Sequence, residues 1–337
     1  MSKLAENKTL SIIIPAFNEE QMIPLTYEAV SKCMVENSIP FEIVFVDDGS
    51  KDKTYEQIEA VAEKCRNEYG TLCGHEDDQN QIPGVVKGVS FSRNFGKESA
   101  IMAGLREATG ACCVVMDCDL QHPIETVPEM YALWNAGYEV VEGVKSDRGQ
   151  ESAIHRGFAK LFYSIISSMS DIDMKDTSDF KLLDRVAVDT LLAMPERAPF
   201  FRGMSQWIGF KSTRISYEVA ERTVGESKWS FSSLVKYAIH NITTFSAKPM
   251  NLVVWLGVVF IVFGFLTAIE ALVRYFQGTA AAGFTTVICL IFIATGFIML
   301  SLGIIGYYIA QIYDEIKARP RYIVRLRCTS AEDNEVE

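Results

Sequence analysis

The sequence has 337 residues, of which 49% are hydrophobic, and carries a formal net charge of −11 at pH 7. A chain of this length can bury a full core and can hold one large domain or two. The negative charge argues against a nucleic-acid-binding protein, since such proteins need clustered lysine and arginine. The eight cysteines are scattered without a CxxC pair, so the sequence indicates neither a zinc site nor a disulfide framework.

Alternating strand and helix patterns fill the first part of the chain. The apolar, β-branched runs that indicate strands cover residues 10–14, 41–46, 84–91, 111–116 and 138–144. Helical patterns between them cover residues 20–35, 52–67 and 97–108. Such alternation predicts right-handed βαβ units and a mostly parallel sheet that helices cover on both faces. We therefore predict an α/β fold.

Short polar sequences follow four of these strands at the point where each strand ends. They are PAFNEE after the first strand, DDGS after the second, SRNFG after the third and DCDLQ after the fourth. Ligands of open α/β sheets bind beyond the carboxyl ends of the strands. This edge of the predicted sheet, here called the ligand edge, is therefore the expected site.

Two aspartates, Asp117 and Asp119, end the fourth apolar run. In an extended backbone, residues i and i+2 point the same way, so both carboxylates can converge on one ion, and Gln121 would continue the row if the backbone stayed extended. Hard oxygen ligands with open positions suit Mg²⁺ or Mn²⁺ bound together with a substrate diphosphate. Because neighbouring carboxylates repel, we also expect a positive group beside them. The adjacent His122 is interpreted as structural.

Asp47 and Asp48 end the second strand, ahead of a glycine and a serine. A turn followed by a helix N-cap would not need two consecutive acidic residues there. One of the two carboxylates is therefore a candidate to accept hydrogen bonds from a nucleobase or ribose, while the other holds the turn. Asn18 and Glu19, which follow Pro15, either cap the next helix or line the same pocket.

The C-terminal part contains two long hydrophobic segments, residues 250–273 and 284–308. Each is long enough to cross a bilayer, which needs about 20 residues; two buried core helices are the alternative. The basic residues that flank the pair are Lys248, Lys317, Arg319, Arg321, Arg325 and Arg327. The positive-inside rule then places both ends in the cytoplasm, which predicts a multi-pass protein of the inner or plasma membrane.

An amphipathic stripe over residues 231–245 precedes the first hydrophobic segment. Its apolar face either packs on the domain core or lies in the membrane interface, and its position favours the interface. The predicted organisation, in chain order, is a cytoplasmic domain over residues 1–228, an amphipathic interface helix over 229–247, a transmembrane helical hairpin over 248–311 and a basic, then acidic, cytoplasmic tail over 312–337.

Six motifs, in this order along the chain, resemble the polyprenyl-phosphate glycosyltransferases of glycosyltransferase family 2: SIIIPAFNEE, VDDGSKDKT, FSRNFGKESAIMAGL, MDCDLQHP, DTSDFKLLDR and RTVGESKWSF. That group includes dolichyl-phosphate mannose synthases and bacterial bactoprenol (undecaprenyl-phosphate) glucosyltransferases. The resemblance runs from about residue 8 through both hydrophobic segments, and the two-helix anchor is most similar to the bactoprenol branch. It implies a GT-A fold, an NDP-sugar donor, a divalent metal and a lipid phosphate acceptor; the net charge predicts no nucleic-acid partner.

The resemblance also implies roles for individual residues, carried over motif by motif. The nucleotide-sugar-binding residues would be Pro15, Ala16, Asn18, Glu19, Asp47, Asp48, Asp117, Arg222, Ser227 and Lys228. The metal, Mg²⁺ or Mn²⁺, would be bound by Asp119 and Gln121. The acceptor phosphate would be bound by Arg148, Arg156 and Arg202, of which Arg148 matches the family most loosely. The catalytic carboxylates would be Asp117, Asp119 and Asp179.

The resemblance implies inversion at the anomeric carbon, with a bound metal neutralising the departing nucleoside diphosphate. The family is often assigned a general base, and Asp179 is the matching residue. A phosphate monoester has a second pKa of about 6, however, so the acceptor is largely a dianion at neutral pH. We therefore expect Asp179 mainly to orient the phosphate or the sugar; a strand-end cap is the structural alternative.

The preferred reaction is transfer of glucose from UDP-glucose to undecaprenyl phosphate. The alternative is a dolichyl- or polyprenyl-phosphate mannosyltransferase that uses GDP-mannose. A processive polysaccharide synthase is disfavoured because the QxxRW motif of such enzymes is missing. A membrane scaffold with a degenerate nucleotide-binding domain is disfavoured because the metal ligands and diphosphate-binding cations are all present. Related proteins suggest a homo-oligomer, most simply a tetramer.

Overall fold

The computed structural model describes residues 8–69, 84–145, 178–196, 199–218, 248–277 and 284–331. The chain divides into two compact units. The first comprises Met1–Ser167, Ile172–Lys228 and Pro320–Glu337, and the second comprises Ser168–Asp171 and Trp229–Arg319. The chain therefore leaves the first unit and returns to it after the hydrophobic segments.

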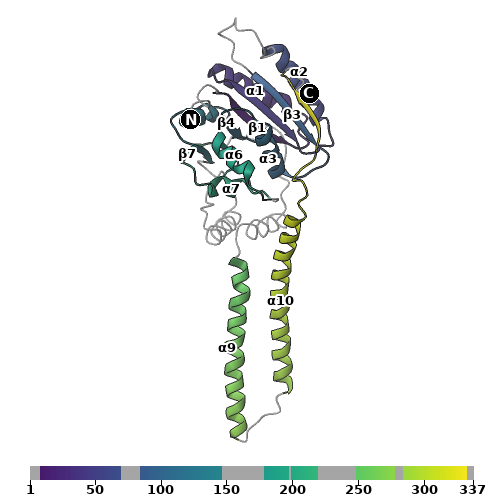
Figure 1. Ribbon diagram of the computed structural model, residues 1–337, viewed down its shortest axis with the longest axis vertical. Coiled ribbons are helices and arrows are strands. Elements are labelled where there is room, and N and C mark those ends of the chain that lie inside the picture. Colours follow the sequence, from purple (N-terminus) through teal and green to yellow (C-terminus); the bar gives the residue numbers. More distant parts are fainter. Residues whose placement is uncertain are drawn as a thin grey trace. The chain divides into compact units, whose positions relative to one another are not determined.

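Four parallel strands form the centre of the sheet in the first unit (Figure 1). They are β1 (Leu10–Ala16), β2 (Phe41–Asp47), β3 (Gly84–Phe91) and β4 (Cys112–Val115). The helices between them in sequence are α1 (Met22–Glu36), α2 (Thr54–Tyr69) and α3 (Lys97–Glu107). β1 pairs in parallel with both β2 and β4, and β2 pairs in parallel with β3. The predicted βαβ alternation, and with it the α/β class, is confirmed.

The remaining part of the sheet on the β4 side is mixed. Its elements are α4 (Thr126–Asn135), β5 (Val140–Lys145), β6 (Lys181–Asp184), α6 (Arg185–Ala193), α7 (Phe201–Trp207) and β7 (Ser212–Tyr217). β6 runs antiparallel to both of its neighbours, β4 and β5, whereas β5 pairs in parallel with β7. The predicted parallel pairing is thus correct at the centre of the sheet, and the sheet as a whole is mixed.

The central strands are buried on both faces, as expected for a parallel sheet covered by helices. Every residue of β2 and β4 is buried. α3 packs closely on β1 because Gly104 has no side chain: a Cβ atom there would lie 2.3 Å from the Cγ2 atom of Ile13. Since α3 follows the carboxyl end of β3, its first residues lie at the ligand edge of this sheet.

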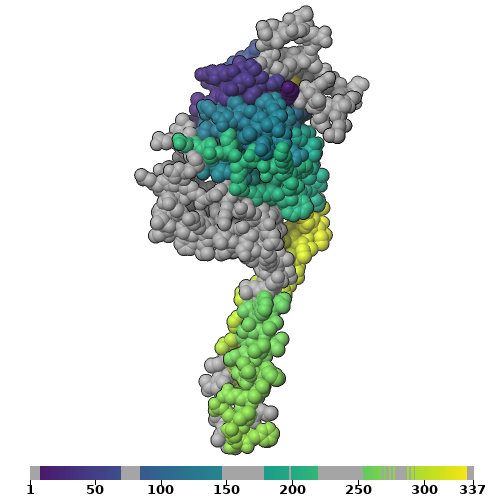
Figure 2. All heavy atoms as spheres, turned by 90° about the vertical axis from the view of Figure 1, so that its left-hand side faces the viewer, coloured from purple at the N-terminus to yellow at the C-terminus, as the bar shows by residue number. Residues whose placement is uncertain are grey.

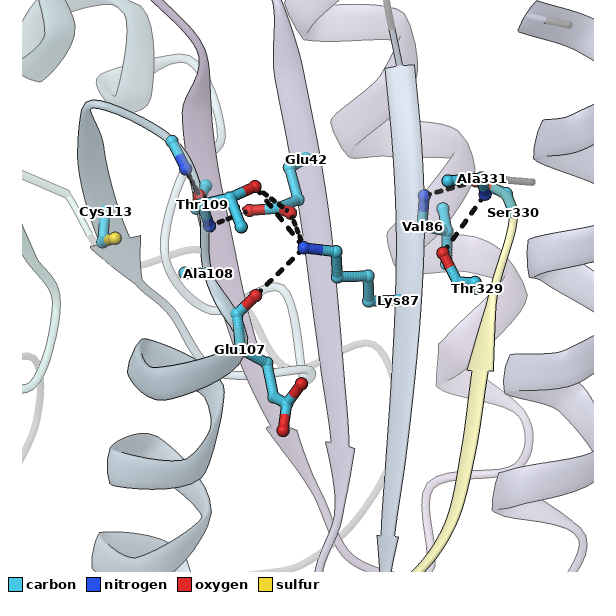
Figure 3. A network of polar contacts seen from close by, with 12 residues as sticks. Glu42, Val86, Lys87, Glu107, Ala108, Thr109, Cys113, Thr329, Ser330 and Ala331 are labelled. Atoms are coloured by element: carbon cyan, nitrogen blue, oxygen red, sulfur yellow. Dashed lines mark hydrogen bonds and ion pairs between the residues drawn. The ribbon is translucent and has the colours of Figure 1, made fainter. Parts of the chain in front are cut away.

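The last described strand, β8 (Val324–Thr329), lies at the edge of the sheet, antiparallel to β3. The strand order is therefore β7-β5-β6-β4-β1-β2-β3-β8. Ser330 continues the pairing, because its hydroxyl accepts from the Val86 N–H and its N–H donates to the Val86 carbonyl, each at 2.8 Å (Figure 3). Arg66 of α2 donates to the carbonyl oxygens of Thr329 and Ser330, at 2.7 and 3.2 Å.

Residues 312–337 were predicted as a basic, then acidic, cytoplasmic tail without a strand; the structure forms β8 within this segment, and its cytoplasmic location stays a prediction. The sequence VRLRCT alternates apolar and basic residues with the period of a strand. The prediction counted only the charge of Arg325 and Arg327, which the positive-inside rule uses, and not this alternation. In the structure Arg327 pairs with Glu107 at the end of α3, at 3.0 Å. The segment that follows the second hydrophobic helix therefore closes one edge of the sheet.

The second unit contains two long helices, α9 (Lys248–Phe276) and α10 (Phe284–Ile316). Many of their described apolar side chains are exposed. The atoms of α9, green in Figure 2, lie open to the viewer. Among the described residues, Ile293–Ile316 is long and apolar enough to cross a membrane, whereas the apolar stretch of α9, Val253–Thr267, is shorter. Both predicted segments thus form long helices, of which one contains a candidate span, and the crossing of the membrane by both helices stays a prediction.

Candidate active site

The loops that follow β1 and β2 are joined to each other by hydrogen bonds. Asn18 has a φ of 55°, and its N–H donates to the Ser50 hydroxyl at 2.8 Å. Its side-chain carbonyl accepts from the Lys51 N–H at 2.9 Å. The Glu19 N–H donates to the Thr54 hydroxyl at 2.9 Å. Asn18 and Glu19 thus brace this part of the ligand edge, and their contact with a nucleotide stays a prediction.

The two strands end side by side, with Pro15 and Ala16 opposite the last residues of β2. The Asp47 carboxylate between these loops is buried, with a residue exposure of 2%. One of its oxygens accepts from the Ser50 N–H at 2.9 Å and the other from the Ser90 hydroxyl at 2.7 Å. Asp47 therefore has the turn-holding role, and its contact with a nucleobase stays a prediction.

Asp48 holds the loop that leads into α3. Its carboxylate accepts from the backbone N–H groups of Phe95, at 2.6 Å, and Gly96, at 2.9 Å. Gly96 has a φ of 96°, which favours glycine, and Lys97 follows as the first residue of α3. Burial raises the pKa of Asp48, and the two N–H donors partly offset that rise. The contacts of Asp48 in the structure position Lys97, and its role in nucleotide binding stays a prediction.

Asp117 and Asp119 lie beyond β4, where the backbone leaves the extended conformation. Leu120 has a φ of 56°, so Gln121 does not continue a straight row of side chains as the extended strand would require. Instead, the Gln121 N–H donates to the Asp119 carboxylate at 3.1 Å. His122 is buried, and its Nδ1 accepts from the Asp117 N–H at 3.3 Å, which supports the interpretation that His122 is structural.

Asp119 and Gln121 supply a carboxylate and an amide oxygen, the hard ligands that Mg²⁺ and Mn²⁺ prefer. Within the part of the chain that the structure describes, no group of three or more His, Cys, Asp or Glu side chains is placed to hold a metal ion. A site with two protein ligands suits an ion shared with a substrate diphosphate, because Mg²⁺ usually keeps positions for waters and phosphate oxygens. The donor set at this turn therefore fits the predicted metal.

Lys97 lies between two of the predicted catalytic carboxylates. Its ammonium is 2.6 Å from the carboxylate of Asp117 and 2.9 Å from that of Asp179. Arg202, the second residue of α7, donates to both oxygens of Asp179 through its Nε and Nη2 atoms, at 2.6 and 2.9 Å. Lys97 is thus a positive group beside Asp117, one of the two carboxylates beyond β4 that were expected to have such a neighbour.

Asp179 is a buried carboxylate held by these two cations. Burial alone would raise its pKa, but Lys97 and Arg202 more than offset this effect and hold the pKa of Asp179 well below its usual range. Two residues further on, Lys181 of β6 pairs with Glu142 of β5 at 3.0 Å, and both side chains are buried. This second ion pair fixes the strand that carries Asp179. Asp179 thus makes ion pairs with two cations, and its role in catalysis stays a prediction.

Two charged residues of the site, Lys97 and Glu98, were not predicted. The Glu98 carboxylate accepts from the N–H of Phe201, at the start of α7, at 2.8 Å. Burial and the nearby Asp179 carboxylate raise the pKa of Glu98 to about 7. The available signal was their place in the motif SRNFGKES, directly after a loop of the ligand edge.

The structure thus brings together Asp117, Asp179 and Arg202 from three parts of the chain, with Lys97 between two of them. Five predicted site residues lie outside the described residues, as does the predicted interface helix over 229–247: Arg148, Arg156, Arg222, Ser227 and Lys228. Their roles stay predictions.

Comparison with known proteins adds a family to this geometry. The family model described as glycosyl transferase family 2 matches residues 11–189. The uncharacterized glycosyltransferase YkcC of Bacillus subtilis is 38% identical over 317 residues, which cover 94% of this chain and 93% of that protein. The prophage bactoprenol glucosyl transferase homolog of Escherichia coli is 35% identical, with 94% and 98% covered. The bactoprenol glucosyl transferase of Shigella phage SfII is 33% identical, with 94% and 97% covered.

Proposed function

The chain belongs to glycosyl transferase family 2, and we propose that this glycosyltransferase moves glucose from UDP-glucose to undecaprenyl phosphate at the cytoplasmic face of a membrane. The observation that carries the proposal is the extent of the similarity, since proteins named bactoprenol glucosyl transferase match 94% of this chain. A match of that extent includes much of α9 and α10 as well as the sheet. It therefore relates the helical part of the chain, and not only the sheet, to proteins named for a lipid acceptor.

Different residues of the ligand edge would bind the metal, the nucleotide and the sugar in this reaction. Asp119 and Gln121 would hold Mg²⁺ or Mn²⁺, which acts as a Lewis acid and neutralises charge on the departing nucleoside diphosphate. The loops after β1, β2 and β3 would surround the nucleotide. The residues that would bind the diphosphate, by resemblance, are Arg222, Ser227 and Lys228. Asp117, which pairs with Lys97 and precedes the predicted metal ligands Asp119 and Gln121, would contact the sugar or ribose.

Asp179 would orient the reactants without accepting a proton. The acceptor phosphate is largely a dianion at neutral pH, because its second pKa is about 6. A carboxylate whose pKa lies well below the usual range is also a weak base. With Lys97 and Arg202 attached to it, Asp179 instead fixes two positive groups at the ligand edge. Attack on the anomeric carbon from the face opposite the leaving group would then invert its configuration.

The helices of the second unit would hold the enzyme at the bilayer that contains its acceptor. The α10 segment Ile293–Ile316 is the candidate span. With 29 residues, α9 is about 43 Å long at 1.5 Å per residue, which exceeds a hydrocarbon core of about 30 Å. We propose that both helices cross as a hairpin, with the sheet and both termini in the cytoplasm. A homo-oligomer, such as a tetramer, is part of the same proposal.

Donor choice is tested by offering the purified enzyme, in detergent with Mn²⁺ and undecaprenyl phosphate, radiolabelled UDP-glucose, GDP-mannose and UDP-galactose in parallel. Label is expected to enter the organic phase from UDP-glucose alone, and this transfer is expected to be lost in the variant Asp119→Ala because it lacks a metal ligand. Transfer from GDP-mannose would favour the mannosyltransferase alternative. Release of nucleotide without labelled lipid would show that the acceptor is wrong.

A further inference from the structure

The pairing of β4 with β6 defines the position that Lys97 occupies. The two strands are antiparallel and pair Val115 with Lys181. Asp117 follows Val115 by two residues, and Asp179 precedes Lys181 by two residues, so both aspartates lie just beyond the last pair of these strands. Neighbouring carboxylates repel each other. The Lys97 ammonium lies between these carboxylates, at 2.6 and 2.9 Å.

Lys97 has capacity for a further partner. Arg202 already binds both oxygens of Asp179. A lysine ammonium has three donors, and the contacts with Asp117 and Asp179 use two of them. The Lys97 side chain is 41% exposed, whereas that of Asp179 is 7% exposed. Of these two partners, Lys97 therefore has the more solvent-accessible side chain.

The backbone before Lys97 is fixed in a way that suits a binding residue. The Asp48 carboxylate accepts from the N–H groups of Phe95 and Gly96, and Gly96 has a φ of 96°. These contacts anchor the first turn of α3, so the lysine side chain starts from a rigid position. Binding groups that are held in place before the ligand arrives lose less conformational freedom on binding.

We propose that Lys97 binds a phosphate oxygen of the acceptor, beside Arg202, and that Asp179 is the positioning residue that directs both cations at that oxygen. The inference rests on the proposed function, in which the acceptor is a polyprenyl phosphate. An ionised Asp179 alone would repel a phosphate dianion, so the two cations must lie between them. The diphosphate of the donor has other candidate partners, namely the metal at Asp119 and Gln121 and the residues of the RTVGESK motif.

The test compares Lys97→Met and Lys97→Arg with Lys64→Met. Lys64 is a matched control, because its ammonium also lies near two carboxylates, Glu28 at 2.9 Å and Glu68 at 3.8 Å, and its side chain is 45% exposed. The KM for a short, water-soluble polyprenyl phosphate is measured with saturating donor. Lys97→Met is expected to raise this KM about 10- to 100-fold, because the variant loses one hydrogen bond between charged groups.

Calorimetry measures binding of the sugar nucleotide with Mn²⁺ to the same variant. This affinity is expected to fall by a clearly smaller factor than the acceptor affinity, because Lys97 would act on the donor only through Asp117. Lys97→Arg is expected to recover much of the acceptor affinity, because arginine also offers charged N–H donors to a phosphate oxygen. Inorganic phosphate is expected to compete with the acceptor in the wild type and to compete less well in Lys97→Met, which would separate recognition of the phosphate from recognition of the lipid chain. The melting temperature shows whether each variant folds. If Lys97→Met melts far below the wild type, acceptor affinity is compared between Lys97→Arg and the wild type instead.

Two outcomes would overturn the assignment of Lys97 and leave the proposed function intact. One is a wild-type acceptor KM in Lys97→Met, and the other is an equal loss of donor and acceptor binding. A wild-type enzyme that transfers sugar to no polyprenyl phosphate would overturn the proposed function, and the assignment of Lys97 with it. Transfer by the wild type, with a selective loss of acceptor affinity in Lys97→Met and none in Lys64→Met, would establish both.

Discussion

Replacing Asp179 with asparagine is expected to lower the rate of glycosyl transfer about 100-fold or more, the loss typical of a preorganised charged group in an active site. The factor is expected to stay constant between roughly pH 6.5 and 8.5. Burial favours the protonated form of Asp179, but Lys97 and Arg202 hold its pKa well below the usual range, so the carboxylate is ionised throughout this interval. Removing a group that does not titrate there adds no new pH dependence.

The measurement is the ratio of kcat/KM in wild type and variant across that interval, with the same donor and acceptor. A general base predicts another result, in which the residual activity of the variant climbs steeply as the pH rises. Asp189→Asn is the matched control, since Asp189 lies on α6, is 64% exposed and pairs only loosely with Arg185 at 3.7 Å. This control is expected to keep the wild-type rate at every pH.

The ligand edge is the part of the site that could be predicted from the sequence. Strand runs that end in polar clusters have a direct physical meaning, because the carboxyl ends of parallel strands meet at one edge. The repulsion between the acidic residues beyond β4 also predicted a positive partner, and Lys97 has that place. What the sequence did not show was which lysine or arginine it would be, since Lys97 is 20 positions from Asp117 along the chain.

Contacts between distant segments account for what could not be predicted. Asp48 reads as part of a turn in sequence, yet its partners are Phe95 and Gly96, from the loop after β3. β6 is only four residues long, too short for a clear pattern, and its direction depends on pairing with β4 and β5. The sequence of β8 alternates like a strand, but the prediction used only the charges of its arginines and so did not include the strand. In each case the missing information was the identity of the neighbour in space.

A buried ion pair lies at the opposite end of the strands from the candidate active site. Glu42, near the start of β2, has a side chain that is 3% exposed, and the Lys87 ammonium of β3 is 2.5 Å from it (Figure 3). The Ser11 hydroxyl donates to the same carboxylate at 2.6 Å, and the Thr109 N–H and hydroxyl donate to it at 2.9 Å each. Burial alone would raise the pKa of Glu42, but Lys87 and these donors hold it below the usual value.

The variant Lys87→Met is expected to lower the free energy of unfolding by about 3–5 kcal/mol, because it leaves the Glu42 carboxylate buried without its counter-ion. In the wild type the lowered pKa of Glu42 means that its stabilisation is present above the unfolded pKa of about 4.3 and is lost as the pH falls. In the variant only the Ser11 and Thr109 donors still oppose the effect of burial on the Glu42 carboxylate. Protonation of Glu42 then relieves the penalty, so the deficit should be largest at neutral pH and shrink in acid.

Urea unfolding in detergent, followed by tryptophan fluorescence, measures the loss at each pH. Lys32→Met is the control, because Lys32 pairs with Glu36 at 3.9 Å on the surface of α1, where such a pair contributes about 0.5 kcal/mol or less. The double variant Glu42→Gln/Lys87→Met should recover part of the stability, since it removes the uncompensated charge. A Lys87→Met protein as stable as the control, or a deficit that grows in acid, would mean that the ion pair does not hold β2 and β3 together.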